Sequence, residues 1–597
     1  LIIFYLTKLK YQVIMMTGAY NLFANNRTKI FNVFTAGCTI PGYPIVSDRI
    51  KNLVGPPKTK INCSDKEHLV TSNSSHIWVI KEEFPSLDIL SESEFYCCYR
   101  HFSAAIKPNN VVYGNCKYFS SIIPAEHEYV RIECYYFDDK IYDDFFVFPS
   151  KETINISTGD DRNSYNILIL GVENMSRMNF HRTMPMTSRF LRNKGFLQLF
   201  GYNKLGDNSF PNLFPVFTGL SFKDIKKTYQ RNKIYLSAFI WDKFKKAGYY
   251  TGLGSDSPAG LFGTYESSFQ YIPTDFYLQP FFSQAINLYK IKDYDYHQCL
   301  GSKFSYRVLL NYIYELTIKL KLVRLFGIFW EESVTHQEDV NNAHIMDEEY
   351  YNLLNNLEAD YYLDKTILIF LSDHGMQRGD IVLTEQGRLE ERLPLMGILF
   401  PFEFRTNYKL AYNNFLINTQ RLTTPFDIYQ TFLDLLDLKS ITDYKIMERS
   451  TSYDSISSAS TLFLPVSERR TCKSLGIGEH WCTCYKGVQL KIGTKARATA
   501  ANHLVQHINN LLGHYPQCRK LKLLSVLYCS VVKNNKREKT YTVTIKTAPG
   551  GAVFDGTLIR DTRTWVVVSD TVSRLNLYRN QSHCVNNNLI KMYCFCE

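Results

Sequence analysis

The strongest constraint on the fold is a set of apolar runs in the middle of the chain, each followed by polar or acidic residues. Such runs are typical of strands that are buried on both faces of a parallel sheet. They cover residues 166–172, 249–252, 325–330 and 366–371. Helical patterns around 238–247 and over 347–358 lie between them. Strands that alternate with helices predict a doubly wound, mainly parallel α/β domain over residues 165–440.

The residues that follow these runs are candidates for a binding site, because ligands of such sheets bind at the carboxyl ends of the strands. Glu173 follows the first run, and the pair Asp373-His374 follows the last. A carboxylate beside an imidazole can bind a divalent transition metal. The alternative for Asp373 is a helix N-cap. Asp256 also follows a strand, and there the pattern favours a turn.

Ser209 lies in the segment 206–213, GDNSFPNL, which is typical of a strand-to-helix turn. A hydroxyl at the start of a helix faces free backbone amides and the positive end of the helix dipole. These groups can stabilise an oxyanion or a developing phosphate charge. The alternative is that Asn208 or Ser209 only caps the helix, with Pro211 in the first turn.

The cysteines lie mainly in the two flanks of this domain. Six fall between Cys38 and Cys134, eight between Cys472 and Cys596, and only Cys299 lies in the middle. This layout predicts disulfides rather than zinc ribbons, whose paired C-x-x-C spacing is missing. Because the total of 15 is odd, one thiol stays unpaired, and we expect it to be Cys299.

The flanks therefore form two further units. We predict a Cys-rich N-terminal region over 1–164, made of short strands and loops, and a Cys-rich, β-rich C-terminal region over 441–597. Disulfides indicate an extracellular or secretory-pathway protein. The chain begins at Leu1, and its first six residues are too few to span a bilayer, so we expect a signal peptide or membrane anchor upstream of the recorded N-terminus.

Glycosylation sequons occur at about the frequency expected by chance in a chain this rich in Asn. They begin at Asn26, Asn62, Asn73, Asn155, Asn174 and Asn580.

The net charge of +11 comes from 68 basic and 57 acidic residues that are spread along the chain. Proteins that bind nucleic acid typically gather basic residues in a stripe or a recognisable module. Neither is present, so the sequence argues against a nucleic-acid partner. The charge favours acidic substrates or anionic membranes, and the oligomeric state stays open.

Several motifs that occur in order carry a resemblance to a known family. They are residues 166–186, 201–220, 370–375, 386–394 and 421–427, with 38–41 and 472–484 in the flanks. Together they resemble the domain-of-unknown-function 229 family, which belongs to the alkaline phosphatase/sulfatase superfamily. The resemblance covers most of the chain and implies an alkaline phosphatase-like α/β fold.

Within that superfamily, the set Glu173, Ser209, Asp373 and His374 is similar to the single-metal site of phosphoethanolamine and phosphoglycerol transferases. The resemblance implies one divalent metal, with zinc as the first choice and manganese as the second. It implies that Ser209 ligates the metal and attacks the phosphorus of an anionic phosphoester substrate. His336 stands where those enzymes place a substrate-binding histidine, which would donate to a phosphate oxygen or protonate a leaving group. The alternative for His336 is a structural role.

The sequence also departs from its relatives. Glu173 and Ser209 replace the usual Asp and Thr, and Tyr429 stands where a histidine is common. No convincing second ligand set exists, which favours one metal over two; the residues considered for it are Asp339, His344 and Asp347. A sulfatase needs a formylglycine formed from Cys in a C-x-P-x-R segment, and the equivalent segment 209–213 has neither Cys nor Arg.

Two functions follow from these observations. The first is an extracellular, metal-dependent phosphoester hydrolase or phosphotransferase with Ser209 as nucleophile. The second is a catalytically inactive extracellular binding protein on the same fold. Arg177, Lys204 and Arg378 lie beside the motifs and could hold substrate anions, although loop cations are often only solvated. We expect residues 386–394 to form an ion-pair network that supports the sheet.

Overall fold

The protein has 597 residues, and its computed structural model describes most of them. The described residues are 31–57, 63, 68–105, 110–149, 164–221, 224, 239–262, 269, 271–288, 298–452, 459–485, 487–533, 538–562, 564–568 and 572–596. The sequons at Asn26, Asn62 and Asn155 lie outside them. Among these residues, no helix has both the length and the apolar composition needed to cross a membrane.

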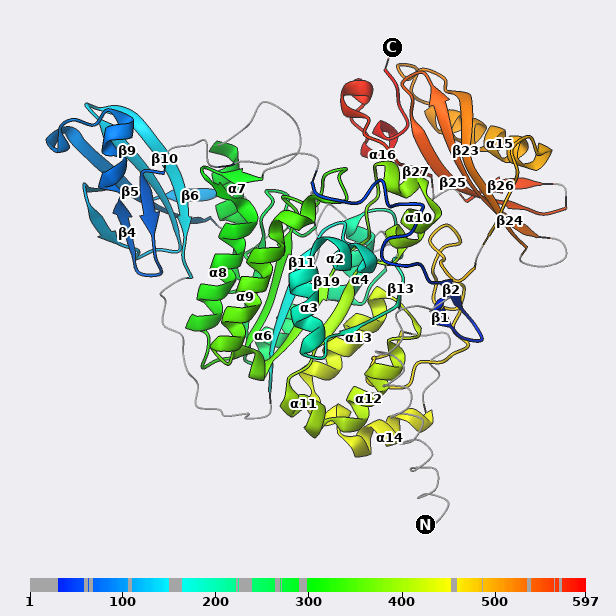
Figure 1. The fold of residues 1–597 in the computed structure, drawn as a ribbon, viewed down its shortest axis with the longest axis horizontal. Helices are drawn as coiled ribbons and strands as arrows, with labels where there is room; N and C mark the ends of the chain where they lie inside the picture. Colours follow the sequence, from blue (N-terminus) through cyan, green and yellow to red (C-terminus); the bar gives the residue numbers. More distant parts are fainter. Residues whose placement is uncertain are drawn as a thin grey trace.

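A seven-stranded sheet forms the centre of the molecule (Figure 1). Its strands, in spatial order, are β12 (Leu197–Gln198), β20 (Met396–Leu399), β19 (Thr366–Leu371), β11 (Asn166–Val172), β18 (Leu325–Glu331), β14 (Tyr250–Ser255) and β15 (Phe276–Tyr277). The five strands from β19 to β15 run parallel, whereas β20 is antiparallel to both of its neighbours. The predicted α/β fold class, with a mainly parallel sheet, is confirmed.

Helices cover both faces of this sheet because successive side chains of a strand point to opposite faces. Ile167 and Ile169 of β11 pack in one core, and Leu168 and Leu170 pack in the other. The first core includes α4 (Ser209–Thr218), α6 (Ile240–Lys246), α11 (Phe402–Asn407), α12 (Lys409–Asn418), α13 (Pro425–Leu436) and α14 (Asp443–Ser452). The second includes α2 (Arg177–Thr183), α3 (Pro185–Asn193), α7 (Gln279–Leu288), α8 (Ser305–Lys319) and α9 (Asp347–Ala359).

The N-terminal region is built from strands, and two of its sheets pack around one core. One sheet contains β3 (Val70–Ser72), β4 (His76–Val79) and β8 (Ile122–Pro124). The other contains β10 (Asp139–Val147), β9 (Tyr129–Tyr136), β5 (Phe95–Ala104), β6 (Val111–Tyr113) and β7 (Lys117–Phe119). Tyr129 joins this region to the central sheet, because its hydroxyl donates to the Tyr277 carbonyl at 2.5 Å.

The C-terminal region contains an antiparallel sheet that is covered on one face by α15 (Lys495–Leu512) (Figure 1). Its strands are β22 (Val488–Gln489), β23 (Lys522–Lys533), β24 (Lys539–Ala548), β25 (Val553–Arg560), β26 (Trp565–Val567) and β27 (Ser573–Arg574), and α16 (Asn588–Lys591) follows them. α10 (Glu385–Arg392) lies between the central sheet and this region, where Arg388 pairs with Asp555 of β25 at 2.7 Å.

Seven disulfides connect the chain, and two of them leave the flank in which they begin. They pair Cys38–Cys484, Cys63–Cys299, Cys97–Cys134, Cys98–Cys116, Cys472–Cys482, Cys518–Cys594 and Cys584–Cys596. The prediction that Cys299 is unpaired is wrong, because Cys63 from the N-terminal region bonds to it. The free thiol is Cys529, whose side chain is buried in the core between β23 and α15.

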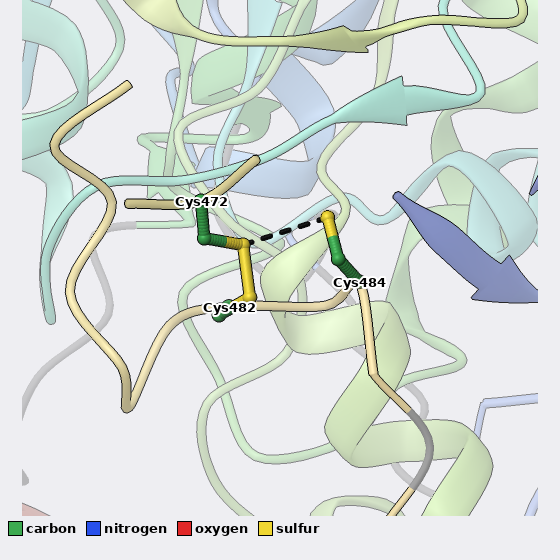
Figure 2. A group of neighbouring side chains, drawn as sticks. All are labelled: Cys472, Cys482 and Cys484. Carbon is green, nitrogen blue, oxygen red and sulfur yellow. Dashed lines mark hydrogen bonds between the residues drawn. A yellow bond between two sulfur atoms is a disulfide. The ribbon is translucent and has the colours of Figure 1, made fainter. Parts of the chain in front are cut away.

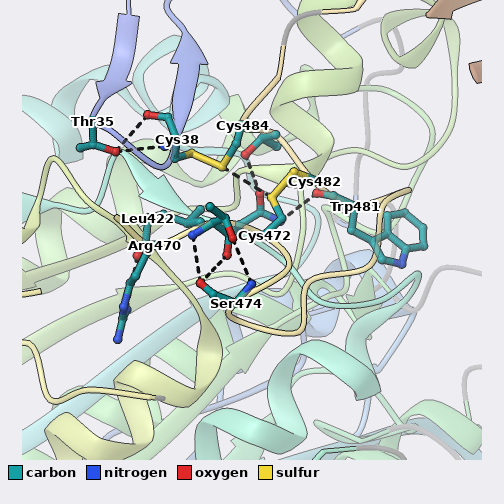
Figure 3. The surroundings of a disulfide bond; sticks show 12 residues. Thr35, Cys38, Leu422, Arg470, Cys472, Ser474, Trp481, Cys482 and Cys484 are labelled. Carbon is teal, nitrogen blue, oxygen red and sulfur yellow. Dashed lines mark hydrogen bonds between the residues drawn. A yellow bond between two sulfur atoms is a disulfide. The ribbon is translucent and has the colours of Figure 1, made fainter. Parts of the chain in front are cut away.

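Two of these disulfides meet at one point of the structure. Figure 2 shows Cys472 bonded to Cys482, with the sulfur of Cys484 beside them, 3.5 Å from that of Cys472. Cys484 is itself bonded to Cys38, which follows β1 (Phe31–Phe34) and precedes β2 (Thr39–Pro41) (Figure 3). The structure thus uses these thiols in disulfides and ties the N-terminal hairpin to segment 472–484.

Candidate metal centre

Two neighbouring strands bring the predicted ligands together. β11 and β19 are parallel neighbours, and Gly171 pairs with Leu371 near their carboxyl ends. Glu173 follows β11 directly and Asp373 comes two residues after β19, so both carboxylates lie at the same edge of the sheet. Ligand atoms of Glu173, Asp373 and His374 all lie within 4.8 Å of one another. The three residues are 4%, 1% and 2% exposed, which makes this a buried charged cluster.

Ser209 completes the cluster from the start of α4. Its hydroxyl donates to Oε1 of Glu173 at 2.8 Å. Asn208 occupies the N-cap position, but its side chain makes no capping hydrogen bond. The first turn of a helix leaves its backbone N–H groups without helical partners, so the positive end of α4 lies beside this hydroxyl.

Trp330 holds the other oxygen of Glu173. The indole Nε1 donates to Oε2 of Glu173 at 2.9 Å, and the whole side chain is buried. Gly171 makes room for the ring, since a Cβ atom there would lie 1.9 Å from a ring carbon. Trp330 was not among the site residues predicted from the sequence.

Asn174 connects the cluster to the loop that follows β18. It has a left-handed backbone with φ of 55°, which Asn tolerates better than most residues. Its N–H donates to Oδ1 of Asp373 at 3.3 Å, and its side-chain amide donates to the Thr335 carbonyl at 3.1 Å. The sequence identified Asn174 only as a sequon, and its burial leaves no room for a glycan.

His374 and Asp373 face each other in a way that requires a positive charge. Nδ1 of His374 lies 3.0 Å from the Gly375 carbonyl, which can only accept, so Nδ1 carries the proton in the neutral ring. Nε2 then has a lone pair, and it lies 2.9 Å from Oδ2 of Asp373. Two lone pairs at this distance need a second ring proton or a cation between them.

The pKa values of the two carboxyls move in opposite directions. Burial raises the pKa of Glu173 well above its ordinary value, and the nearby Asp373 and Glu332 add to the shift. Burial also acts to raise the pKa of Asp373, but the charge and hydrogen bond of His374 outweigh it, so the pKa of Asp373 is lowered. Two buried carboxylates beside a hydroxyl and an imidazole form a donor set of three oxygens and one nitrogen, which fits a divalent cation.

His336 lies in the loop after β18, and acidic side chains fix this loop. Asp256 accepts from the backbone N–H of Glu332 at 2.8 Å and from the Ser333 hydroxyl at 2.6 Å. Glu331 accepts from the Thr335 hydroxyl at 2.9 Å. Asp256 therefore anchors a loop beside the cluster. Among the described residues, His336 is not a member of the metal-ligand cluster, and its role in binding substrate stays a prediction.

The residues considered for a second metal do not join the cluster in the described part of the chain. Asp347 accepts from the backbone N–H groups of Met186 and Thr187, at 2.8 and 2.9 Å, and so caps the start of α3. Asp339 accepts from Asn341, and His344 lies in a short 3-10 helix.

The basic residues near the motifs have different surroundings. Lys204 is fully buried and paired with Glu391, so it is not free to hold a substrate anion. Arg177 is buried, donates to Asn32 at 3.2 Å and lies over the ring of Phe200. Arg378 is half-buried, and none of the described residues forms an ion pair with it. The predicted ion-pair network of residues 386–394 is present, because Arg182 pairs with Glu390 and Arg392 lies 3.5 Å from Asp555.

The family described as "Protein of unknown function (DUF229)" matches residues 56–527. No curated protein matches the chain.

Solved structures with a related fold share little sequence with this chain. A protein in the alkaline phosphatase superfamily from Vibrio parahaemolyticus has 14% identity and a TM-score of 0.32, over 72% of this chain and 84% of that chain. The C-terminal periplasmic domain of phosphoethanolamine transferase EptC from Campylobacter jejuni has 11% identity and a TM-score of 0.31, over 46% of this chain and 95% of that chain. The lipoteichoic acid synthase LtaP from Listeria monocytogenes has 13% identity and a TM-score of 0.31, over 40% of this chain and 66% of that chain. Scores this low assign no activity.

Proposed function

The chain belongs to the DUF229 family, and from that premise we propose that it is a metal-dependent phosphoester hydrolase or phosphotransferase of the alkaline phosphatase/sulfatase superfamily. One observation carries the proposal. A helix-start hydroxyl, that of Ser209, donates to a buried carboxylate in a cluster whose His374 and Asp373 face each other across 2.9 Å. A nucleophile beside a cation site is the arrangement that phosphoryl transfer requires.

The residues that would hold one divalent metal are Glu173, Ser209, Asp373 and His374. Zinc suits this mixture of oxygen and nitrogen donors, and manganese is the second choice. When bound, the metal would lower the pKa of the ligating hydroxyl and offset the negative charge of the phosphoryl group.

Ser209 would attack phosphorus, forming an Oγ–P bond as the bond from phosphorus to the leaving oxygen breaks. The nearest acceptor for the hydroxyl proton is Oε1 of Glu173, at 2.8 Å. The amides of the first turn of α4 would stabilise charge that develops on the phosphoryl oxygens. His336, on the anchored loop, would protonate the leaving oxygen or bind a phosphoryl oxygen. Water or a second alcohol would then release the group from Ser209.

The substrate in this proposal is an anionic phosphoester outside the cell or in the secretory pathway. Seven disulfides support an oxidising compartment, where such bonds form and persist.

Elemental analysis and turnover test the proposal on protein from a secretory host. We expect about one zinc or manganese per chain, loss of that metal in Asp373→Ala, and full retention in Asp380→Ala, an exposed aspartate nearby. With bis(4-nitrophenyl) phosphate as probe, Ser209→Ala should lower kcat by roughly a thousandfold or more, because the nucleophile is gone.

A folded protein that stays metal-free after reconstitution would contradict the proposal and favour an inactive binding protein. Full turnover in Ser209→Ala would instead refute the assigned nucleophile.

A further inference from the structure

One short segment of the C-terminal region, residues 573–577, contacts three of the four segments that carry the candidate site. It consists of β27 and the three residues after it. β27 pairs with β25, the strand whose Asp555 binds Arg388 of α10, so the segment lies on the side of the C-terminal sheet that faces the central domain. Figure 1 shows β27 at this side, close to α10.

The first contact is with the loop before the nucleophile. The Ser573 hydroxyl donates to Oδ1 of Asp207 at 2.7 Å, and Asp207 precedes Ser209 by two residues. Two further donors in the described part of the chain bind the backbone of this residue: Nζ of Lys204, at 3.0 Å, and Nε2 of Gln377 both donate to the Asp207 carbonyl. Ser573 is therefore a separate anchor, which fixes the side chain of Asp207.

The second and third contacts are with the loops after β18 and β19. The Leu577 N–H donates to the Glu338 carboxylate at 3.2 Å, and Glu338 follows His336 by two residues. Leu575 packs against the small apolar cluster that contains Met376, which follows His374 by two residues. Each of the two hydrogen bonds thus reaches a residue two positions from a residue of the candidate site, and the apolar cluster includes a third residue at that spacing.

We propose that segment 573–577 is a positioning element that aligns Ser209 with the metal ligands and with His336, so that the C-terminal region completes the active site. This inference rests on the proposed function. Ser573 acts through Asp207 and is a positioning residue, since it touches no reacting atom. A small displacement of a nucleophile can cost up to about a hundredfold in rate, so one hydrogen bond at this place is enough to matter.

Ser573→Ala tests the proposal in the full-length protein, with Ser573→Thr as the variant that keeps the hydroxyl. We expect Ser573→Ala to lower kcat for bis(4-nitrophenyl) phosphate by about tenfold, to leave KM within about twofold and to keep the metal content. Ser573→Thr should restore kcat. Ser525→Ala, an exposed serine on β23, is the matched control and should behave as the unaltered protein.

Hydrogen exchange gives a second reading that does not depend on activity. Peptides covering 204–212 should exchange faster in Ser573→Ala than in Ser573→Thr or Ser525→Ala. Unchanged exchange and unchanged kcat in Ser573→Ala would overturn the proposal, and so would equal losses in Ser525→Ala. If Ser209→Ala refutes the nucleophile, the exchange measurement still decides whether Ser573 holds this loop.

Discussion

At the scale of residues, the candidate site depends on hydrogen bonds that hold the carboxylate of Glu173 in place. Both oxygens of Glu173 are already engaged, one by Ser209 and the other by Trp330. A carboxylate held in this way has a fixed orientation, and partners of this kind tune the affinity of a metal site.

Trp330→Phe should therefore weaken metal binding by about 10- to 100-fold, because the phenyl ring fills much of the same space but cannot donate to Glu173. Competition with a chelator would measure the affinity. Trp241→Phe is the control, because Trp241 is equally buried and its indole N–H has no described hydrogen-bond partner. An equal change in both variants would show that packing, and not the hydrogen bond, is responsible.

The clustering of Glu173, Asp373 and His374 could be predicted from sequence, whereas the residues that support this cluster could not. Glu173, Asp373 and His374 lie within three residues of the ends of apolar runs, and strand ends of a parallel sheet meet at one edge. The contact from Trp330 depends on a ring that crosses to the neighbouring strand over Gly171. The role of Asn174 depends on a positive φ. Neither the ring contact of Trp330 nor the positive φ of Asn174 can be predicted from a local pattern of residue types.

At the scale of elements, α10 supports the candidate site through a backbone hydrogen bond and a buried ion pair. The backbone N–H of Gly375, next to His374, donates to the Glu391 carbonyl at 3.0 Å. The Glu391 side chain pairs with Lys204, whose side chain is 0% exposed and whose ammonium also binds the loop before Ser209. Removing one member of such a pair leaves an uncompensated buried charge.

Glu391→Ala should lower the free energy of unfolding by about 3–5 kcal/mol, because Lys204 then stays buried without its partner. Denaturant unfolding would measure this change. The double variant Lys204→Met with Glu391→Leu should be less destabilised. Glu448→Ala, which breaks an exposed pair with Lys445, should cost at most about 1 kcal/mol. A loss no larger than that in Glu391→Ala would contradict the role given to the buried pair.

Elements of the central sheet were predicted well because their signals are local. The predicted runs 166–172 and 366–371 coincide with β11 and β19. The N-terminal region was expected to hold short strands, yet β5, β9 and β10 have 10, 8 and 9 residues. Polar and charged residues interrupt the sequences of these strands, so they lack the continuous apolar runs that marked the central sheet.

At the scale of the whole molecule, a buried histidine makes the contact between α10 and the C-terminal sheet sensitive to acid. His480 is buried, and its Nδ1 lies 2.7 Å from the Thr557 hydroxyl of β25. Burial, together with the charge of Arg392, lowers the pKa of His480 to about 3. The neutral ring is therefore the form that fits the folded protein.

The sign of the pH effect follows from this shift. Below about pH 6.5 the histidine is protonated in the unfolded chain but stays neutral in the folded protein. The contribution of His480 to the free energy of unfolding is therefore fully present above pH 6.5 and is lost as the pH falls toward 3. The contribution is about 1.4 kcal/mol per pH unit. Unfolding midpoints at pH 7.5 and 5.0 should differ less in His480→Asn than in the unaltered protein. Exposed His514→Asn is the control, and an unchanged pH dependence in His480→Asn would contradict the assignment.

The bond between Cys38 and Cys484 joins residues that are 446 positions apart, which limits how early this disulfide can form during synthesis. A ribosome adds about 5–20 residues per second, so roughly 20–90 s pass between the synthesis of the two cysteines. Throughout that interval Cys38 lacks its partner and is open to oxidation with Cys63, Cys97 or any other early thiol. The native bond of Cys38 therefore forms only after Cys484 has been made, and any earlier disulfide of Cys38 has to be exchanged for it.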